Sequence, residues 1–230
     1  KTTSRELTEQ ALSRINDPDG EGSRTFLQVH DQSSLVAADA SPIRKIPYRT
    51  PEHRHDGTQW YWITPMGELP MSVMGRHNLA NAEGARWLAQ EMGIQEADFY
   101  EAIASFQGAQ RRLEPLADSA RRAVYLDFAH APSKVAATTA AFSESFGSRP
   151  VWGLLELHTF SSLNPEFLPG YAGSLNGLDR AMVLFDPAAV AHKKLPPLSP
   201  DAVRAAFGPG VEVFTSSDAL SETLERDAPE

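Results

Sequence analysis

Residues 123–132 read Ala-Val-Tyr-Leu-Asp-Phe-Ala-His-Ala-Pro and lead from an apolar run directly into a helical pattern. The pattern predicts a strand over 123–128 and a helix over 133–146, with apolar side chains on one helix face. Open α/β sheets bind ligands where their strands end. We therefore expect Asp127 and His130 at a ligand-facing edge. The alternative interpretation is an Asp that caps the next helix and a surface His.

Strand and helix patterns continue to alternate after this stretch, which favours a parallel sheet with right-handed crossovers. The run 151–157, apolar except for Glu156, is interpreted as a continuous apolar strand, as expected for a sheet buried on both faces. The fold class predicted is α/β: a C-terminal Rossmann-like, mostly parallel sheet with helices on both faces. The further elements expected are strands at 180–185 and 211–214, and helices at 164–171, from Ser199-Pro200 onward, and at 216–224.

The preceding stretch reads as a smaller α/β segment. Prolines punctuate residues 41–54, which favours extended chain or a linker. Two short strands around Met66-Gly67 predict a hairpin, and two helices follow, the first ending at Gly93. The ranges expected are strands at 59–63 and 69–74 and helices at 78–92 and 95–106; the buried face of the first helix would carry Ala82, Ala85, Leu88, Ala89 and Met92.

Residues 1–41 form a separate helical piece in this interpretation, starting with a capping box at Thr3-Ser4-Arg5-Glu6. The stretch resembles the N-terminal helices of amidase-signature hydrolases, without their Ser-Ser-Lys machinery. Lys1-Thr2-Thr3 is similar to the end of a phosphate loop, but no glycines precede it. A natural or artificial junction near Ala40-Ser41 is a further possibility.

Composition excludes several classes of function. The 230 residues carry a net charge of -9, which argues against non-specific nucleic-acid or anionic-membrane binding. There is no cysteine, so a disulfide framework, a zinc-thiolate site and a cysteine nucleophile are excluded. No apolar run reaches membrane-spanning length. These features fit a cytoplasmic protein.

The motif Gly75-x-His77-Asn78-x-x-Asn81 lies at a predicted strand-to-helix junction. Carboxamides there can read an adenine edge, because Asn both donates and accepts hydrogen bonds. The alternative is that Asn78 caps the helix and His77 is a turn residue.

A second motif, Phe106-x-Gly108-x-x-Arg111-Arg112-x-Glu114, closes the next helix. A guanidinium here suits a phosphate or a carboxylate, which it can bind with two parallel hydrogen bonds. The alternative is a cationic last turn that the helix dipole favours, with Glu114 pairing to a neighbour.

A polar loop, residues 155–162 (Leu-Glu-Leu-His-Thr-Phe-Ser-Ser), ends the next predicted strand. Its hydroxyls and imidazole would face a ligand at the sheet edge, or form an ordinary Ser-rich turn. Residues 53–56 hold two His and one Asp in what reads as a polar loop without a matching partner set, so no metal is assigned.

These motifs, in this order and at this spacing, resemble the Mur ligases, ATP-dependent enzymes that join amino acids or peptides to a nucleotide-linked muramic acid. The resemblance covers about residues 42–230: a remnant of the central ATP-binding domain at 42–121 and the C-terminal domain at 122–230. Most Mur ligases carry His or Asn where this chain has Ala131. By resemblance, the catalytic residues are His130 and Arg111, the ATP-contacting residues are His77, Asn78, Asn81, Arg112 and Asp127, and the substrate-contacting residues are His158, Thr159, Ser161 and Ser162.

The resemblance implies ATP and Mg²⁺ as cofactors, and a UDP-muramoyl carboxylate with an amino acid or peptide as substrates. The sequence lacks a glycine-rich phosphate loop, so we expect no turnover by the chain alone. Two alternatives stay open: a non-catalytic nucleotide- or peptide-binding module, and a fragment of an amidase-type hydrolase. The acceptor and the oligomeric state are not determined by the sequence.

Overall fold

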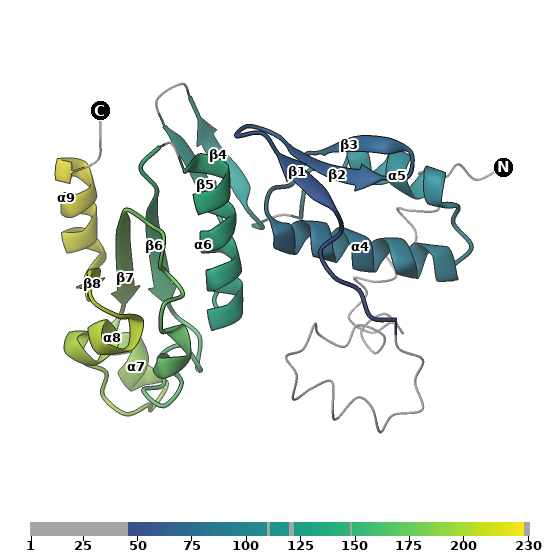
Figure 1. Cartoon of the computed structure of the whole chain (residues 1–230). Helices are drawn as coiled ribbons and strands as arrows, with labels where there is room; N and C mark the ends of the chain where they lie inside the picture. The colour runs from purple at the N-terminus through teal and green to yellow at the C-terminus, as the bar shows by residue number, and fades with distance from the viewer. Residues whose placement is uncertain (1–45, 110, 120–121, 148, 228–230) are drawn as a thin grey trace, which may run out of the picture.

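The computed structural model describes residues 46–109, 111–119, 122–147 and 149–227, arranged as two packed halves (Figure 1). The capping box, the amidase-like helices and the possible junction at Ala40-Ser41 lie outside the described residues. No helix in these ranges is both long and apolar enough to cross a membrane.

The first half is a three-stranded antiparallel sheet, in the order β1-β2-β3, packed against two helices. The predicted hairpin is confirmed, with Trp62 opposite Leu69. The polar loop predicted around His53 and His55 is wrong, because these residues form a strand. The sequence did not predict this strand because all three of its residues are polar, whereas strand patterns are recognised by their apolar residues. The elements are β1 (His53–His55), β2 (Trp60–Thr64), β3 (Gly67–Met71), α4 (Arg76–Glu91) and α5 (Glu96–Ala104).

Aromatic packing stabilises this first half. The buried Trp62 ring meets Phe99 and Tyr100 edge-on, with centroids 6.4 and 5.4 Å apart, the arrangement that ring quadrupoles favour. The first helix ends as expected, with Gly93 at φ +84°. Its buried face is only partly as predicted: Ala82 and Ala89 are buried, but Met92 is half exposed and Ala85 is exposed.

The second half contains a parallel sheet in the order β6-β7-β8 with helices around it. Its core includes Val183 and Phe185 of the central strand, Val203 and Tyr171, all fully buried. The predicted α/β class is confirmed. The elements are α6 (Pro132–Phe146), β6 (Trp152–Leu157), the 3₁₀ helix η1 (Leu168–Tyr171), β7 (Arg180–Phe185), α7 (Pro187–His192), α8 (Pro200–Phe207), β8 (Val211–Phe214) and α9 (Ser217–Asp227).

Two predictions about the sheet are wrong. The strand ahead of Asp127 is β5 (Ala123–Leu126), and it pairs antiparallel with β4 (Glu114–Asp118) rather than with the parallel sheet. It is not buried on both faces, since Leu126 is 40% exposed. The run 151–157 is likewise not buried on both faces: β6 is an edge strand, and its Leu154 is 48% exposed.

Helix α6 connects the two halves. The indole Nε1 of Trp60 in β2 donates to Ser145 Oγ at 2.9 Å. Arg76, at the start of α4, pairs with Glu144 at 2.9 Å. A side chain added at Gly75 would place its Cβ 2.5 Å from that of Ala141. The start of α4 is therefore held directly against α6.

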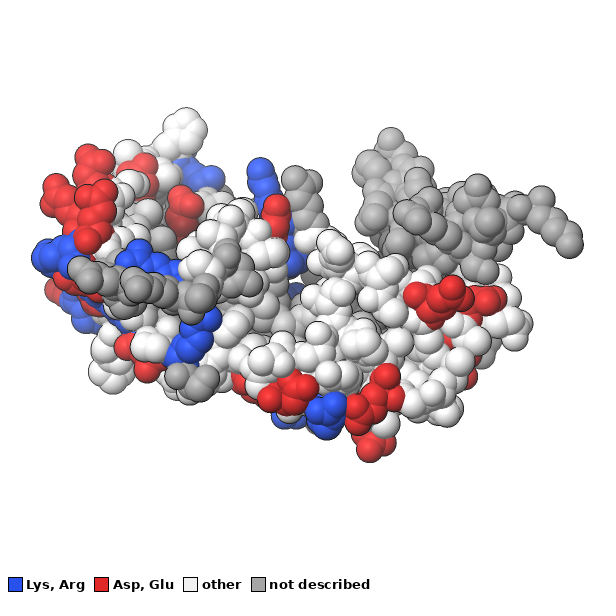
Figure 2. Space-filling model, turned by 90° about the horizontal axis from the view of Figure 1, so that it is seen from above, with Lys and Arg blue, Asp and Glu red and all other residues white. Residues whose placement is uncertain are grey.

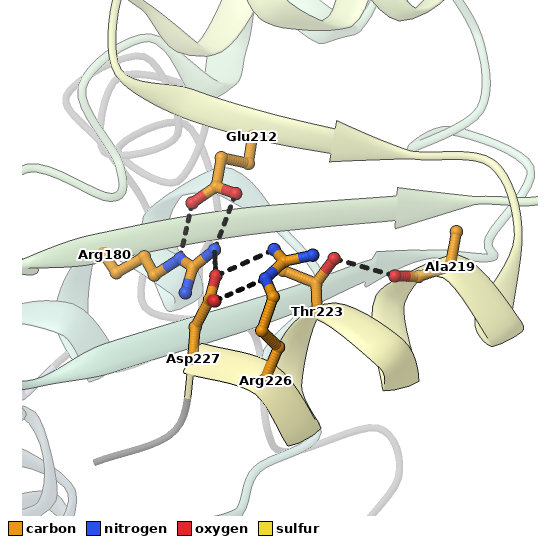
Figure 3. A network of polar contacts seen from close by, with 6 residues as sticks. All are labelled: Arg180, Glu212, Ala219, Thr223, Arg226 and Asp227. Atoms are coloured by element: carbon orange, nitrogen blue, oxygen red, sulfur yellow. Dashed lines mark hydrogen bonds and ion pairs between the residues drawn. The ribbon is translucent and has the colours of Figure 1, made fainter.

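Charged groups close the far end of the parallel sheet (Figure 3). Arg180 of β7 donates to both oxygens of Glu212 on β8, at 2.5 and 2.9 Å, and to Asp227 of α9 at 3.0 Å. These contacts lower the pKa of both carboxyl groups, chiefly through hydrogen bonds from Arg180 to Glu212 and from Arg226 to Asp227. One guanidinium therefore joins two strands and the last helix.

We predict that Arg180→Met lowers the urea midpoint of unfolding at pH 7, because two carboxylates lose their shared donor. The matched control is Arg204→Met, whose partner Asp201 is 91% exposed and whose loss should leave the midpoint unchanged. Because folding lowers these two pKa values, the ionised carboxylates stabilise the fold at pH values above their ordinary pKa values, 4.5 for Glu212 and 3.8 for Asp227. The gap between wild type and Arg180→Met should therefore close as the pH falls below those ordinary values and through the lowered pKa values of the folded state. Equal midpoints for the two variants at pH 7 would contradict the assignment.

Candidate functional site

Asp127 is the centre of the candidate site. It follows β5, and its carboxylate accepts hydrogen bonds from Thr138 Oγ1 of α6 at 2.5 Å and from the Phe128 N–H at 3.0 Å. A longer contact comes from the Leu113 N–H at 3.4 Å. The half-buried carboxylate is thus held by a helix and by the loop that precedes β4. A carboxylate fixed in this way can still accept hydrogen bonds from a ligand, because each oxygen has two lone pairs.

His77 lies in the same electrostatic environment. It is half-buried at the start of α4, and burial lowers the pKa of its imidazole. Asp127 raises this pKa, whereas Lys134 and Arg112 lower it further. The imidazole is therefore kept neutral near pH 7, beside one carboxylate and two cations. One residue from each of the three predicted motifs therefore takes part in this electrostatic environment.

Gly75 determines how His77 is presented. Its φ of +89° lies in the left-handed region that favours glycine, and the His77 ring is 3.1 Å from the position of an added Cβ. Asn78 Nδ2 donates to the Met74 carbonyl at 2.9 Å, so part of its amide secures the strand-to-helix turn. It is not the N-cap, which is Gly75. Asn81 is exposed on α4, one turn farther on.

Arg111 and Arg112 lie in a strained loop. Arg111 has φ +57° and Leu113 has φ +49°, left-handed values that are uncommon outside glycine. The Arg111 N–H donates to Glu114 Oε2 at 2.8 Å, and its carbonyl accepts from the Phe128 N–H at 2.9 Å. Both arginine side chains are exposed. In the described residues neither guanidinium forms an ion pair, so both can bind an anion.

His130 and His158 meet beyond the ends of β5 and β6, with ring centroids 6.2 Å apart. The Phe128 ring contacts both, at 5.0 and 6.2 Å. Buried Tyr171 donates its hydroxyl to the His130 carbonyl. The two loops predicted to face ligands therefore adjoin one another.

The hydroxyls after His158 are used mainly within their own turn. Ser162 is 1% exposed; its Oγ accepts from the Thr159 N–H at 3.0 Å, and Thr159 Oγ1 donates to it at 2.8 Å. Ser161 is exposed, with its Oγ 3.3 Å from Thr159 Oγ1. Of the three hydroxyl side chains, Ser161 is the most open to a ligand. The neighbouring Phe160 ring is 61% exposed.

Sequence reading missed two residues of this region, Lys134 and Thr138. Both lie on α6, four residues apart and thus on one helix face, and they follow His130 at spacings of four and eight. No local pattern distinguishes either residue from the other polar side chains of α6.

Figure 2 shows a broad area without charged side chains in the middle of one face, with acidic and basic side chains along its edges.

Known proteins are similar to this chain in sequence and in fold. The chain is 33% identical over 185 residues to the UDP-N-acetylmuramate–L-alanine ligase of Arthrobacter sp. (strain FB24), which covers 77% of this chain and 39% of that ligase. The structure is similar to that of UDP-N-acetylmuramate-alanine ligase MurC from Thermotoga maritima, with a TM-score of 0.58, 18% identity, and coverage of 78% and 40% of the two chains. The chain is a member of the Mur ligase family, matching its C-terminal part.

A further Mur-like fold is that of Mycobacterium tuberculosis folylpolyglutamate synthase, whose structure is a complex with ADP. It has a TM-score of 0.51 and 19% identity, and covers 77% of this chain and 40% of its own. The Mur-like chain matches no family model. It spans about two fifths of the length of the ligases it resembles.

We predict that Gly75→Ala lowers the free energy of unfolding by roughly 2–3 kcal/mol, from a left-handed backbone and an overpacked contact with Ala141. Gly93→Ala is the matched control, because Gly93 has φ +84° but nothing within 4 Å; it should cost only about 1 kcal/mol. In an Ala141→Gly background the close contact is absent, so Gly75→Ala should cost only about 1 kcal/mol there. Urea unfolding measures each variant against its own background, and equal losses for Gly75→Ala and Gly93→Ala in the wild-type background would refute the close contact.

His77 predicts a specific pH dependence. Its pKa is lowered on folding, so its contribution is complete above the ordinary value of 6.5 and stability falls as the pH drops below it, because the unfolded state binds the proton more readily. His77→Gln should flatten this decline between pH 8 and 5 in urea titrations. A variant with the wild-type slope would show that His77 is not the group responsible.

Proposed function

We propose that this chain carries the nucleotide- and acceptor-facing part of an ATP-dependent ligase of peptidoglycan precursor synthesis. The reaction would join an amino acid or peptide to a UDP-muramoyl carboxylate. The observation that carries the proposal is that Asp127, ahead of α6, and Arg112, ahead of β4, both act electrostatically on His77 at the start of α4, in a chain whose relatives are UDP-N-acetylmuramate–L-alanine ligases.

Each side chain has a proposed role consistent with its surroundings. Asp127 would accept hydrogen bonds from ribose hydroxyls, since Thr138 and Phe128 already fix its orientation. Asn78 and Asn81 would contact adenine, with Asn78 using the amide atoms that do not bond Met74. Arg112 would bind phosphate, where a cation stabilises transferring charge.

Arg111 and His130 are the proposed catalytic residues. An exposed guanidinium can stabilise charge on a transferring phosphoryl group, and a neutral imidazole can take a proton from an attacking amine. His158, Thr159 and Ser161 would orient the amine, while Ser162 would shape their turn from its buried position.

ATP supplies the phosphate that activates the substrate carboxylate in this proposal. The fixed Asp127 carboxylate supports the binding of ATP at this site. So do Arg111 and Arg112, which form no ion pair in the described residues. Magnesium is treated differently: where the structure describes the chain, no group of three or more His, Cys, Asp or Glu side chains could hold a metal ion. We therefore derive no step through magnesium.

We infer the same division of the chain as the sequence resemblance implies, with residues 42–121 from the ATP-binding central domain and 122–230 as the C-terminal domain. A cytoplasmic location would suit nucleotide-linked substrates. Because the 230 residues include no glycine-rich phosphate loop, ATP turnover would require that element from elsewhere. Binding without turnover, the behaviour of a non-catalytic module, is the second candidate, and this same absence favours it.

Calorimetric titration with ADP and ATP tests the proposal. We expect saturable binding that weakens about tenfold or more, at least about 1.4 kcal/mol, in both Asp127→Ala and Arg112→Ala. Thr138→Val is the matched control: it removes one hydrogen bond to Asp127 but keeps the carboxylate, so binding should weaken less. No binding at millimolar nucleotide, or binding unaffected by both alanine variants, would sink the proposed nucleotide site. ATP hydrolysis by the wild-type chain would separately exclude the non-catalytic module.

A further inference from the structure

The His130 and His158 rings share one hydrogen-bonding arrangement. His130 Nδ1 lies 2.9 Å from the Phe128 carbonyl oxygen, and His158 Nδ1 lies 3.2 Å from that of Glu156. A carbonyl oxygen only accepts, so each Nδ1 must carry the proton. In the neutral ring this leaves a lone pair on Nε2, and in the described residues neither Nε2 has a hydrogen-bond partner.

This is the arrangement found around metal-bound imidazoles. A ligating His usually donates its other ring N–H to a carbonyl or carboxylate, which fixes both the tautomer and the ring orientation. Here two rings are prepared in the same way, on two different loops, with centroids 6.2 Å apart and planes inclined by 58°. Zn–N bonds are about 2.0–2.1 Å long, which places each ring centroid roughly 3.2 Å from a bound ion. Two tetrahedral ligands would then have centroids roughly 5 Å apart, so the two loops need to move together by only about 1 Å from the separation of 6.2 Å.

Neighbouring residues also hold the two rings in place. Fully buried Tyr171 donates to the His130 carbonyl, and the neighbouring Ala129 packs against the core of the parallel sheet. The Phe128 ring lies against both imidazoles. His158 is exposed, so an ion could enter from solvent.

We propose that His130 and His158 form a two-imidazole site for a divalent transition-metal ion of the zinc type. Imidazole nitrogen suits zinc, copper and nickel, whereas magnesium prefers oxygen ligands. No third His, Cys, Asp or Glu completes a metal-binding group in the part of the chain that the structure describes. The remaining coordination positions are therefore open to water, or to a carboxylate or amine of a bound molecule. This site does not depend on the proposed ligase function, and a bound ion would occupy the His130 lone pair that the proposed proton transfer uses, so the ion and the proton transfer exclude one another.

The tautomers give the first test. In the metal-free 230-residue chain, labelled with ¹⁵N-histidine, we expect the neutral rings of His130 and His158 to be protonated at Nδ1, assigned with the His→Ala variants. Addition of Zn²⁺ should shift the Nε2 resonances of both while both Nδ1 protons remain. Protonation of either neutral ring at Nε2 instead would overturn the proposal.

Zinc calorimetry gives the second test. We expect one Zn²⁺ per chain, bound about tenfold or more weakly by His130→Ala and by His158→Ala. His192→Ala is the control: this exposed imidazole ends α7, and its loss should leave zinc affinity unchanged. Circular dichroism checks that each variant is folded, and a folded His130→Phe variant replaces any that is not. Absence of zinc binding, or dependence on only one of the two histidines, would overturn the site.

Discussion

The contact between α6 and the start of α4 is the constraint on which the candidate site depends. Gly75 lies against Ala141, and Trp60 is hydrogen-bonded to Ser145, so the first half is fixed on one face of this helix. Asp127 precedes the same helix and is tied to it through Thr138. The separation between the His77 turn and the Asp127 carboxylate is consequently set by the packing of one helix, without a direct bond between them.

The loop before β4 contributes the cations at a cost in backbone energy. Arg111 and Leu113 both adopt left-handed φ values, each of which costs roughly 1–3 kcal/mol for such residues. Burial of Leu113, which is 8% exposed, and the hydrogen bonds from this loop to Asp127 and Phe128 offset that cost. Arg112 stands between the two strained residues. Its position is therefore fixed by the same contacts that hold Asp127.

The helices and strands that the sequence predicted correctly are those determined by interactions between neighbouring residues. The helix expected at 78–92 is found at Arg76–Glu91, and Ser199 caps its helix by accepting from the Ala202 N–H at 3.1 Å. The strands expected at 180–185 and 211–214 are also confirmed. Each depends on periodicity, capping or glycine, which neighbouring residues reveal.

What depends on distant partners was not predictable in this way. Strand β4 contains Pro115, which reads as a strand breaker but is tolerated here beside an irregular register. Whether β6 is covered on one face or two is decided by its place at the sheet edge, which an apolar run cannot reveal. The approach of His77 to Asp127 was implied by family resemblance alone, and Lys134 was missed because a surface lysine on a helix carries no distinguishing local signal.

The imidazoles show why convergence matters more than local geometry. His53, like His130 and His158, places its Nδ1 near the carbonyl two residues earlier, at 2.7 Å from Pro51 O. Its ring, however, stacks on Trp60 with centroids 5.9 Å apart. The same local contact thus serves packing on β1. Beyond β5 and β6 the same contact leaves two Nε2 atoms available to a metal ion, because two loops there bring two such rings close together at the surface.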